Sequence, residues 1–408
     1  MNDNLIEIHH CEVCGSKQLS KVLDLGRHPL CDDLVAIGDP RVCREYPIEI
    51  LFCERCCTAH QHYQIPKTEL FPSTYHYRSR HTADVLNGMR QLVEATERLA
   101  GSLQGRKVLD VGCNDGSLLG FFAQRGARSF GVEPTGAAAD AVAGGHDVVN
   151  DFLTEDVARA FVERHGQPDV ITFTNVFAHI EDLEAVIRSL KILSAPGTLI
   201  VVENHYLGAI VARNQFDTFY HEHPRTYSFR SFEFIAASLG MRVAKAEFPH
   251  RYGGNIRVFM TAADLGTEAD AAEELRAREG GYGEGLVALA QGIDRWKANK
   301  GARIQEAVRR NGPLKGKAFP GRSAIPIKML GLTERDVAAV YEKPASIKVG
   351  HYVPGTRIPI LSDDDFVPSD TPVLLNMAWH IAAEIGTYMR TRGYQGGIID
   401  IIAEEDFR

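Results

Sequence analysis

The chain has 408 residues, of which 44% are hydrophobic and 24% charged, as is typical of a globular protein with two or three domains. Its formal net charge is −8 and it has no lysine- or arginine-rich block, which argues against nucleic acid as the main partner, because binding phosphates needs a clustered basic face. MNDNLIEIHHCEVC, at the N-terminus, does not read as a signal peptide and no membrane-length apolar run occurs, so we expect a cytoplasmic protein without membrane contacts.

The cysteines are concentrated at the N-terminus, with seven of the eight in the first 57 residues. CEVC and CERC form two Cys-x-x-Cys pairs, and this spacing lets one tight turn present two thiolates to the same tetrahedral ion. The alternative is a set of unrelated buried cysteines. We predict a structural zinc site with no open coordination position, whose ligands are Cys11, Cys14, Cys53 and Cys56.

Residues 106–126, RKVLDVGCNDGSLLGFFAQRG, predict a strand, a glycine loop and a helix. Gly112 and Gly116 make the turn, and such glycines let a ligand approach the backbone closely. The segment SFGVEP then predicts a second strand ending at Glu133, where a carboxylate can accept hydrogen bonds from both hydroxyls of a ribose. A further strand, turn and helix are predicted over residues 168–183.

This middle region resembles the class I S-adenosylmethionine-dependent methyltransferases, because LDVGCNDGSLL matches their first motif and GVEP their ribose-binding strand end. A dinucleotide fingerprint is less suitable, because GCNDG is not GxGxxG. The resemblance implies that the glycine loop faces the methionine portion, that Glu133 holds the ribose, and that two apolar members of the set, Phe152 and Val176, line the pocket or belong to the core. The implied cofactor contacts are Asp110, Gly112, Asn114, Gly116, Glu133, Pro134, Asp151, Phe152, Asn175 and Val176.

The segment FDTFYHEH, residues 216–223, places a phenol, two imidazoles and a carboxylate at four consecutive positions. Imidazole is a base suited to near-neutral pH, a carboxylate can fix its tautomer, and a phenol can donate to a developing enolate oxygen. This combination favours proton removal from carbon. The alternative is a polar loop with a local hydrogen-bond network.

The whole chain resembles the sugar C-methyltransferases, which act on nucleotide-linked keto-deoxysugars in antibiotic and cell-surface sugar pathways. The segments that carry the resemblance include LDLGRHPLCDDL, YHYRS, NVFAHI, FDTFYHEH, YGGNIRVF, VGHYVPGTRIPI and LLNMAWH. It implies that His223 is the general base and that Tyr220, Glu222 and His179 support it. It also implies that Tyr75 or Tyr77 closes over the sugar and that His221 points away.

The predicted reaction follows from carbonyl chemistry. A C4 ketone acidifies the C3 proton, His223 removes it, and Tyr220 or His179 stabilises the enolate, so that C3 is methylated by S-adenosylmethionine. Two alternatives remain open: methylation of a sugar oxygen or nitrogen, and a binding or scaffold protein that has lost catalysis.

Residues 314–332, LKGKAFPGRSAIPIKMLGL, predict a strand, loop and helix of a second nucleotide-binding unit, after a connecting helix in the second half of residues 266–312. This loop is less glycine-rich than is usual in the family, which leaves the nucleotide open. Arg257 has a surface ion pair as its alternative role. The predicted substrate contacts are Tyr75, Tyr77, Arg78, Asn255, Arg257, Arg322, Ser323 and Lys328.

The predicted fold class is α/β: a Rossmann-like class I methyltransferase domain flanked by an N-terminal zinc-binding domain and a C-terminal Rossmann-like α/β domain. The expected boundaries are 1–70, 71–265 and 266–408. We expect a nucleotide-sugar substrate, bound S-adenosylmethionine and zinc, and a monomer or weak homo-oligomer.

Overall fold

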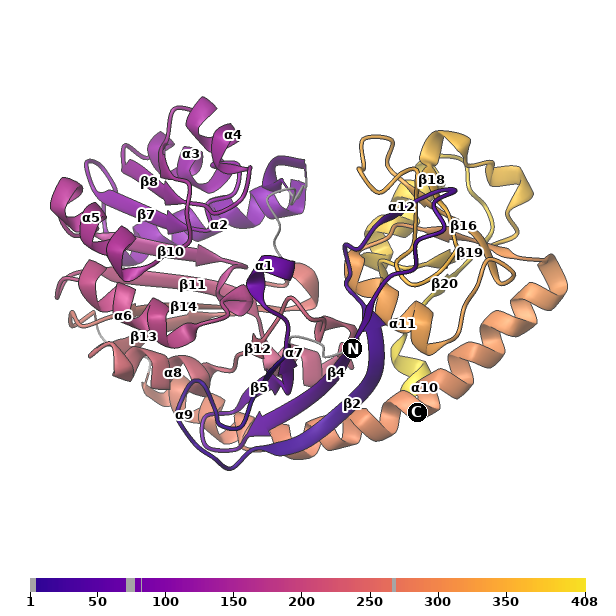
Figure 1. The fold of residues 1–408 in the computed structure, drawn as a ribbon, viewed down its shortest axis with the longest axis horizontal. Coiled ribbons are helices and arrows are strands. Elements are labelled where there is room, and N and C mark those ends of the chain that lie inside the picture. The colour runs from indigo at the N-terminus through magenta and orange to yellow at the C-terminus, as the bar shows by residue number, and fades with distance from the viewer. Residues whose placement is uncertain (1–4, 71–77, 82, 266–268) are drawn as a thin grey trace.

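The computed structural model describes residues 5–70, 78–81, 83–265 and 269–408 (Figure 1). In the picture the middle and C-terminal domains lie side by side, and the N-terminal strands run below and between them. Within the described residues, no helix combines the length and the apolar character that crossing a membrane requires.

The N-terminal module is a curved antiparallel sheet with the strand order β12-β5-β4-β2. Its outer strand β12 comes from the middle of the chain, not from the module itself. Short antiparallel pairs join β1 to β6, and β3 to β17 of the C-terminal domain. The elements are β1 (Ile6–Glu7), β2 (Ser20–Pro29), β3 (Val35–Ala36), β4 (Glu45–Cys53), β5 (Thr58–Gln61), β6 (Tyr63–Gln64), α1 (Lys67–Leu70) and β12 (Arg225–Thr226).

The middle domain is built on a sheet with the order β13-β14-β11-β10-β7-β8-β9. The strands β11, β10, β7, β8 and β9 are neighbours in this order and run parallel to one another. Strand β14 is antiparallel to both β11 and β13. The chain runs outward from β7 to β9 and then returns to β10 on the other side of β7. Ligands of doubly wound sheets bind at such a switch point, outside the carboxyl ends of the strands.

The elements of this domain confirm the predicted strands and helices. They are α2 (Ala83–Ala100), β7 (Lys107–Val111), α3 (Ser117–Gln124), β8 (Arg128–Val132), α4 (Ala138–Ala143), β9 (Asp147–Val149), α5 (Glu155–His165), β10 (Val170–Thr174), α6 (Leu183–Leu193), β11 (Leu199–His205), α7 (Leu207–Ala212), α8 (Phe229–Ser238), β13 (Arg242–Glu247) and β14 (Asn255–Thr261).

The C-terminal domain has a parallel sheet with the order β18-β16-β15-β19-β20, and its switch point lies between β15 and β19. The predicted Rossmann-like fold of this domain is therefore confirmed. Its elements, with the helices that lead into it, are α9 (Ala269–Glu279), α10 (Tyr282–Asn311), β15 (Leu314–Lys317), α11 (Ala324–Met329), β16 (Val337–Glu342), β17 (His351–Tyr352), β18 (Ile360–Ser362), β19 (Val373–Asn376), α12 (Ala382–Thr391) and β20 (Gly397–Asp400).

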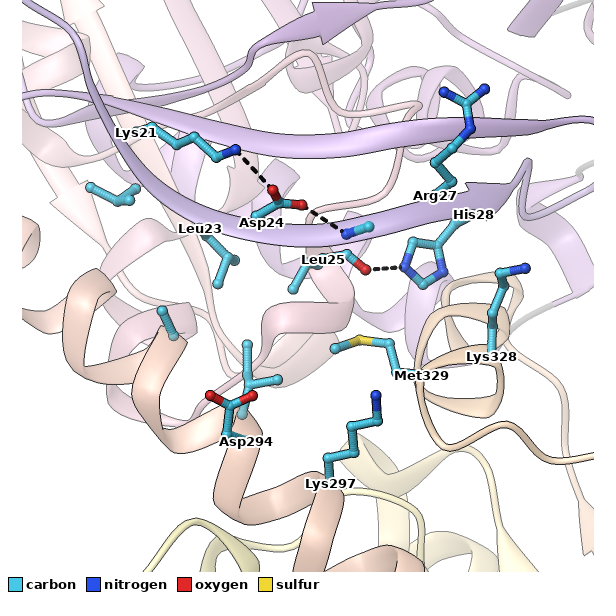
Figure 2. Close-up of a pocket in the computed structure, with 14 residues that line it drawn as sticks. Lys21, Leu23, Asp24, Leu25, Arg27, His28, Asp294, Lys297, Lys328 and Met329 are labelled. Carbon is cyan, nitrogen blue, oxygen red and sulfur yellow. Dashed lines mark hydrogen bonds and ion pairs between the residues drawn. The ribbon is translucent and has the colours of Figure 1, made fainter.

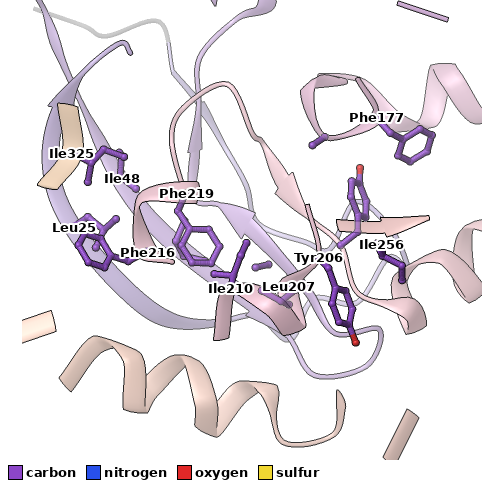
Figure 3. Packing of buried hydrophobic residues seen from close by; sticks show 14 of the residues in the cluster. Leu25, Ile48, Phe177, Tyr206, Leu207, Ile210, Phe216, Phe219, Ile256 and Ile325 are labelled. Carbon is purple, nitrogen blue, oxygen red and sulfur yellow. The ribbon is translucent and has the colours of Figure 1, made fainter. Parts of the chain in front are cut away.

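One hydrophobic core runs through all three parts of the chain (Figure 3). Leu25 and Ile48 of the N-terminal sheet and Ile325 of α11 belong to the same cluster as Phe216 and Phe219. Both phenylalanines are almost fully buried, so the two phenylalanine positions of FDTFYHEH anchor this segment where the domains meet.

Helix α10 is the long element that joins the two larger domains (Figure 1). Its Trp296 is fully buried, lies 4.8 Å from the ring centroid of Phe216, and donates from Nε1 to the carbonyl oxygen of Ile401 at 3.0 Å. The indole therefore packs both on the FDTFYHEH segment and on the C-terminal domain.

Truncating this indole should destabilise the protein. We expect Trp296→Ala to lower the free energy of unfolding by about 3–5 kcal/mol, because it leaves a cavity in the shared core. Urea unfolding followed by circular dichroism measures the change. The control, Val287→Ala at a half-exposed position of the same helix, should stay within about 0.5 kcal/mol. Equal effects of the two variants would contradict the anchoring role of Trp296.

Candidate active site

The four predicted metal ligands come together in the N-terminal module. Their Sγ atoms all lie within 4.8 Å of one another, with 3.4 Å between Cys11 and Cys56 and 3.6 Å between Cys14 and Cys53. Zinc–thiolate bonds of about 2.3 Å in a tetrahedron require sulfur separations of about 3.8 Å, so the cluster fits zinc closely. Four thiolates fill the coordination sphere, and the zinc is therefore structural.

The glycine loop follows β7 and lies at the switch point of the middle sheet. Gly112 and Gly116 have φ values of 74° and 78°, and Asn114 between them also lies in the left-handed region. A Cβ atom on Gly112 would come within 2.5 Å of the Val176 side chain, so only glycine fits between the loop after β7 and the loop after β10. Asn175 has the same left-handed backbone, and strain of this kind is often found at ligand sites.

Glu133 lies at the carboxyl end of β8, with its carboxylate fixed by the neighbouring loops. One oxygen accepts from the backbone N–H of Asn114 at 2.9 Å, and the other accepts from the N–H and hydroxyl of Thr135 at 2.9 and 2.6 Å. The oxygen that accepts from Asn114 has a second lone pair, so the carboxylate can still accept from a ribose hydroxyl. The backbone around Pro134 is fixed too, because Asn150 donates to the carbonyl oxygens on either side of it.

The remaining predicted cofactor contacts occupy distinct places. Asp110 is buried in β7 and accepts from Thr172, and burial followed by the nearby Glu133 raises its pKa to about 7. Asp110 therefore supports the glycine loop from within β7. Asp151 is exposed and accepts from the N–H of Phe152, whose ring lies 4.3 Å from the Lys67 ammonium of the N-terminal module.

The FDTFYHEH segment contributes to a cluster of aromatic and imidazole rings. The ring centroid of His223 lies 4.1 Å from Tyr220, 4.8 Å from His179 and 5.2 Å from His205. His179 follows β10 and His205 ends β11, so both occupy the carboxyl edge of the sheet next to Asn175. The structure therefore places the predicted base beside the predicted cofactor edge.

The hydrogen bonds of the cluster determine the tautomers. The Nδ1 of His223 lies 3.2 Å from the carbonyl oxygen of Thr218, and the Nδ1 of His179 lies 2.7 Å from that of Glu222. A carbonyl can only accept, so the Nδ1 of His223 carries the hydrogen and the Nε2 of its neutral ring keeps its lone pair. Backbone carbonyls, and not the carboxylate predicted from the sequence, thus fix the tautomer.

Burial keeps these imidazoles neutral. It lowers the pKa of His223 well below its ordinary value, and the nearby His179 and His205 lower it further, against the Thr218 carbonyl. The pKa of His179 falls to about 4 through burial, although the carbonyls of Glu222 and Asn175 oppose the shift. His223 is accordingly a neutral proton acceptor at pH 7.

The two other predicted groups of the motif keep their protons. Burial raises the pKa of Glu222 to about 8, and Asp32 adds to the shift while Lys348 opposes it. Burial also raises the pKa of Tyr220 well above 10, with Glu222 as the next cause. Tyr220 is therefore a hydrogen-bond donor throughout the physiological range. His221 faces away, with Nε2 3.1 Å from the carbonyl oxygen of Tyr46.

Arg322 is a predicted substrate contact that reaches this cluster. Its Nε lies 3.2 Å from the Asp217 carboxylate and its Nη1 donates to the Thr218 hydroxyl at 3.0 Å, while Nη2 is buried without a partner among the described residues. Trp379 donates to the same carboxylate at 2.9 Å. Arg322 and Trp379 follow β15 and β19, so the switch point of the C-terminal sheet faces the FDTFYHEH segment.

The other predicted substrate contacts within the described residues have protein partners elsewhere, so they are not assembled into one site. Arg78 pairs with Asp140 beside the glycine loop. Arg257 is buried between Glu203 and Glu247, and so is not the surface ion pair considered as its alternative. Tyr75 and Tyr77 lie outside the described residues.

The predicted substrate contacts Arg322, Ser323 and Lys328 have different partners in the structure. Ser323 is buried and donates to the carbonyl oxygen of Met377. Lys328 pairs with Glu45 and lines a cavity of about 900 Å³ between β2, α10 and α11, which none of the clustered histidines lines (Figure 2). Asn255 is buried too, and donates to Asn175 and Glu203.

Sequence reasoning missed His205, Asp217 and Trp379. His205 is the last residue of a strand that faces the same edge as Asn175, and that position was the available signal. Asp217 lies within the quoted motif, but its partners Arg322 and Trp379 come from another domain, so no local pattern could reveal the contact.

Three family models match successive parts of the chain. The model described as "Putative zinc binding domain" matches residues 11–71, "Methyltransferase domain" matches 80–246, and "C-methyltransferase C-terminal domain" matches 250–402. The C-methyltransferase NovU of Streptomyces niveus is 29% identical over 395 residues, which cover 94% of this chain and 93% of NovU. The chain belongs to the S-adenosylmethionine-dependent C-methyltransferases.

Two other similarities of this C-methyltransferase cover less than half of the chain. A ubiquinone biosynthesis O-methyltransferase of Bordetella avium is 35% identical over 109 residues, which cover 26% of this chain and 45% of that protein. Magnesium protoporphyrin IX methyltransferase from Synechocystis PCC 6803, solved with bound SAH, is 18% identical with a TM-score of 0.35, over 44% of this chain and 83% of that one.

Removing the carboxylate of Glu133 should weaken cofactor binding by this C-methyltransferase. We expect Glu133→Ala to lose about 1.5–3 kcal/mol of affinity for S-adenosylhomocysteine, because charged hydrogen bonds to the ribose disappear. Isothermal titration calorimetry measures this change. Glu163→Ala, at an exposed position on α5, is the control and should bind normally. Unchanged affinity of Glu133→Ala would remove the ribose contact from the site.

Proposed function

We propose that this C-methyltransferase methylates C3 of a nucleotide-linked 4-keto-deoxysugar and that His223 is the general base. The observation that carries the proposal is the neutral His223 ring, whose Nδ1 faces the Thr218 carbonyl and whose Nε2 is left as a proton acceptor. A carbon acid next to a ketone needs such a base, because its proton must be removed before the carbon can accept a methyl group. When bound, S-adenosylmethionine supplies the electrophilic methyl.

The enolate oxygen that forms on proton removal needs a hydrogen-bond donor. Tyr220 retains its proton and its ring lies against His223, so we assign this role to Tyr220. His179 is less suitable, because its ring already has the backbone carbonyls of Glu222 and Asn175 as hydrogen-bond partners. The free Nη2 of Arg322 adds a fixed positive charge close to the cluster. A preorganised donor of this kind is typically worth ~10²–10³ in rate.

The substrate class is supported by two features of the C-terminal domain. Its sheet has a nucleotide-binding order, and the switch point between β15 and β19 faces the histidine cluster. A nucleotide at that edge would carry its sugar toward His223. The resemblance of the whole chain to the sugar C-methyltransferases points to the same class of substrate.

The alternative of oxygen or nitrogen methylation fits the site less well. A hydroxyl or amine substrate needs one base and no enolate donor, whereas His223 is surrounded by His179, His205, Tyr220 and Arg322. The similarity to NovU along the full chain also favours carbon. A scaffold without catalysis would not require a carbonyl-oriented imidazole beside an intact glycine loop.

Exchange of the C3 proton tests the base directly. When the protein is incubated with a 4-keto nucleotide sugar in deuterium oxide, C3 of the sugar should take up deuterium, which NMR follows. We expect His223→Asn to slow both exchange and methyl transfer by ~10²–10⁴, the usual contribution of a positioned base. His165→Asn on α5 is a control that should exchange normally. Normal exchange by His223→Asn, or methyl on a heteroatom, would contradict the proposal.

The pH dependence of kcat/KM should reflect the lowered pKa of His223. A general base works when neutral, so activity is present above its pKa and is lost as the pH falls through it. Because burial, His179, His205 and Arg322 all lower this pKa, we expect a constant kcat/KM from neutrality down through pH 6.5 and a fall only at lower pH. Arg322→Gln should move the fall toward pH 6.5. A fall centred at or above pH 6.5 in the unaltered enzyme would contradict this assignment.

A further inference from the structure

The N-terminal module with its four cysteine ligands, called the zinc module below, is in direct contact with the segment that carries the proposed base. Strand β5 begins two residues after the ligand Cys56 and pairs with β12, so that His60 lies opposite Arg225 and Ala59 opposite Thr226. The N–H of Gln61 also donates to the carbonyl oxygen of Pro224 at 2.8 Å. The module's sheet therefore takes the residues directly after His223 as its outer strand.

Side chains and backbone of the module also hold the residues before His223. The side-chain amide nitrogen of Gln61, Nε2, donates to the carbonyl oxygens of Phe219 and Tyr220 at 3.2 and 3.3 Å. His221 contacts the carbonyl oxygen of Tyr46 in β4. Gln61 is almost fully buried. Bonds from a rigid sheet to both sides of His223 leave its backbone little freedom.

A buried ion pair connects a metal knuckle to both histidine-bearing loops. Glu12 stands between the ligands Cys11 and Cys14, and its carboxylate lies 2.6 Å from Nη1 of the fully buried Arg225. The same guanidinium donates to the carbonyl oxygen of Glu181 at 3.3 Å and to the Tyr227 hydroxyl at 3.0 Å.

Arg225 thus follows His223 by two residues and contacts Glu181, which follows His179 by two residues. Removing one partner of a buried pair leaves an uncompensated charge, so this contact is sensitive to small changes. The Glu12 carboxylate is itself held by Gln64, which donates to it at 2.7 Å.

We propose that the zinc module positions the proposed base His223 and the neighbouring His179, with Glu12, Gln61 and Arg225 as positioning residues that act through these two rings. The inference rests on the proposed function, because it assigns the module to the chemical step of that reaction. The cofactor edge is built by the loops after β7, β8 and β10, so loss of these contacts should change turnover and leave cofactor binding intact.

The test uses Glu12→Gln and Gln61→Leu in the zinc-loaded, full-length protein, with Glu49→Gln as the matched control. Glu49 lies in β4 of the same module, but it pairs with Lys21 and His62. A displacement of about 1 Å at a reacting group costs about 10²-fold in rate. We expect kcat and C3 exchange to fall by about that factor in both variants, with unchanged KM, zinc content and affinity for S-adenosylhomocysteine.

A second measurement needs no substrate. Hydrogen–deuterium exchange followed by mass spectrometry should show faster amide exchange over residues 216–226 in both variants, and unchanged exchange over residues 107–116. Normal kcat with only a lowered unfolding midpoint, or faster exchange at the glycine loop, would overturn the proposal. Wild-type protein that leaves a 4-keto nucleotide sugar unaltered would refute the proposed function instead, while the amide-exchange result would still decide the positioning role.

Discussion

The hydrogen bond between Nδ1 of His223 and the carbonyl oxygen of Thr218 is the interaction on which the site depends. It fixes the ring orientation and the tautomer together, so that Nε2 is the atom that can receive a proton. A backbone carbonyl five residues earlier in the chain can only be in this place if the segment between the two residues has a defined turn. The conformation of residues 216–226 is therefore the main constraint on the orientation of the proposed base.

Each part of the chain contributes to that conformation. Phe216 and Phe219 are buried in the shared core, and the zinc module supplies a neighbouring strand and the amide of Gln61. The C-terminal domain contributes Arg322, which contacts both Asp217 and Thr218. The site is consequently a property of the domain junction, which gives a physical reason for the three parts to occur in one polypeptide.

The predictions from the sequence that were confirmed rest on the local spacing of residues. Two Cys-x-x-Cys pairs specify a tetrahedral ligand set, and the order of strand, glycine loop and acidic strand end specifies a doubly wound sheet. Gly112 illustrates the reason, because a left-handed backbone packed against Val176 leaves room for glycine only. The roles of individual site residues in binding and catalysis stay predictions.

The sequence could not reveal contacts that form between domains. Arg322, Ser323 and Lys328 lie within seven positions and were predicted as substrate contacts, yet they contact Asp217, the Met377 carbonyl and Glu45 respectively. Their directions are set by α11 and by the sheets packed against it. His205 was passed over because β11 reads as an ordinary buried strand until its last residue is placed beside His179 and His223.

The protonation state of His223 tests the central claim most directly. Nitrogen-15 NMR of histidine-labelled protein at pH 7, with the signal assigned by comparison with His223→Asn, distinguishes the two ring nitrogens. A neutral ring with a protonated Nδ1 and an unprotonated Nε2 is the predicted result. An imidazolium, or a neutral ring with its hydrogen on Nε2, would contradict it, because neither state leaves Nε2 free to accept a proton from carbon.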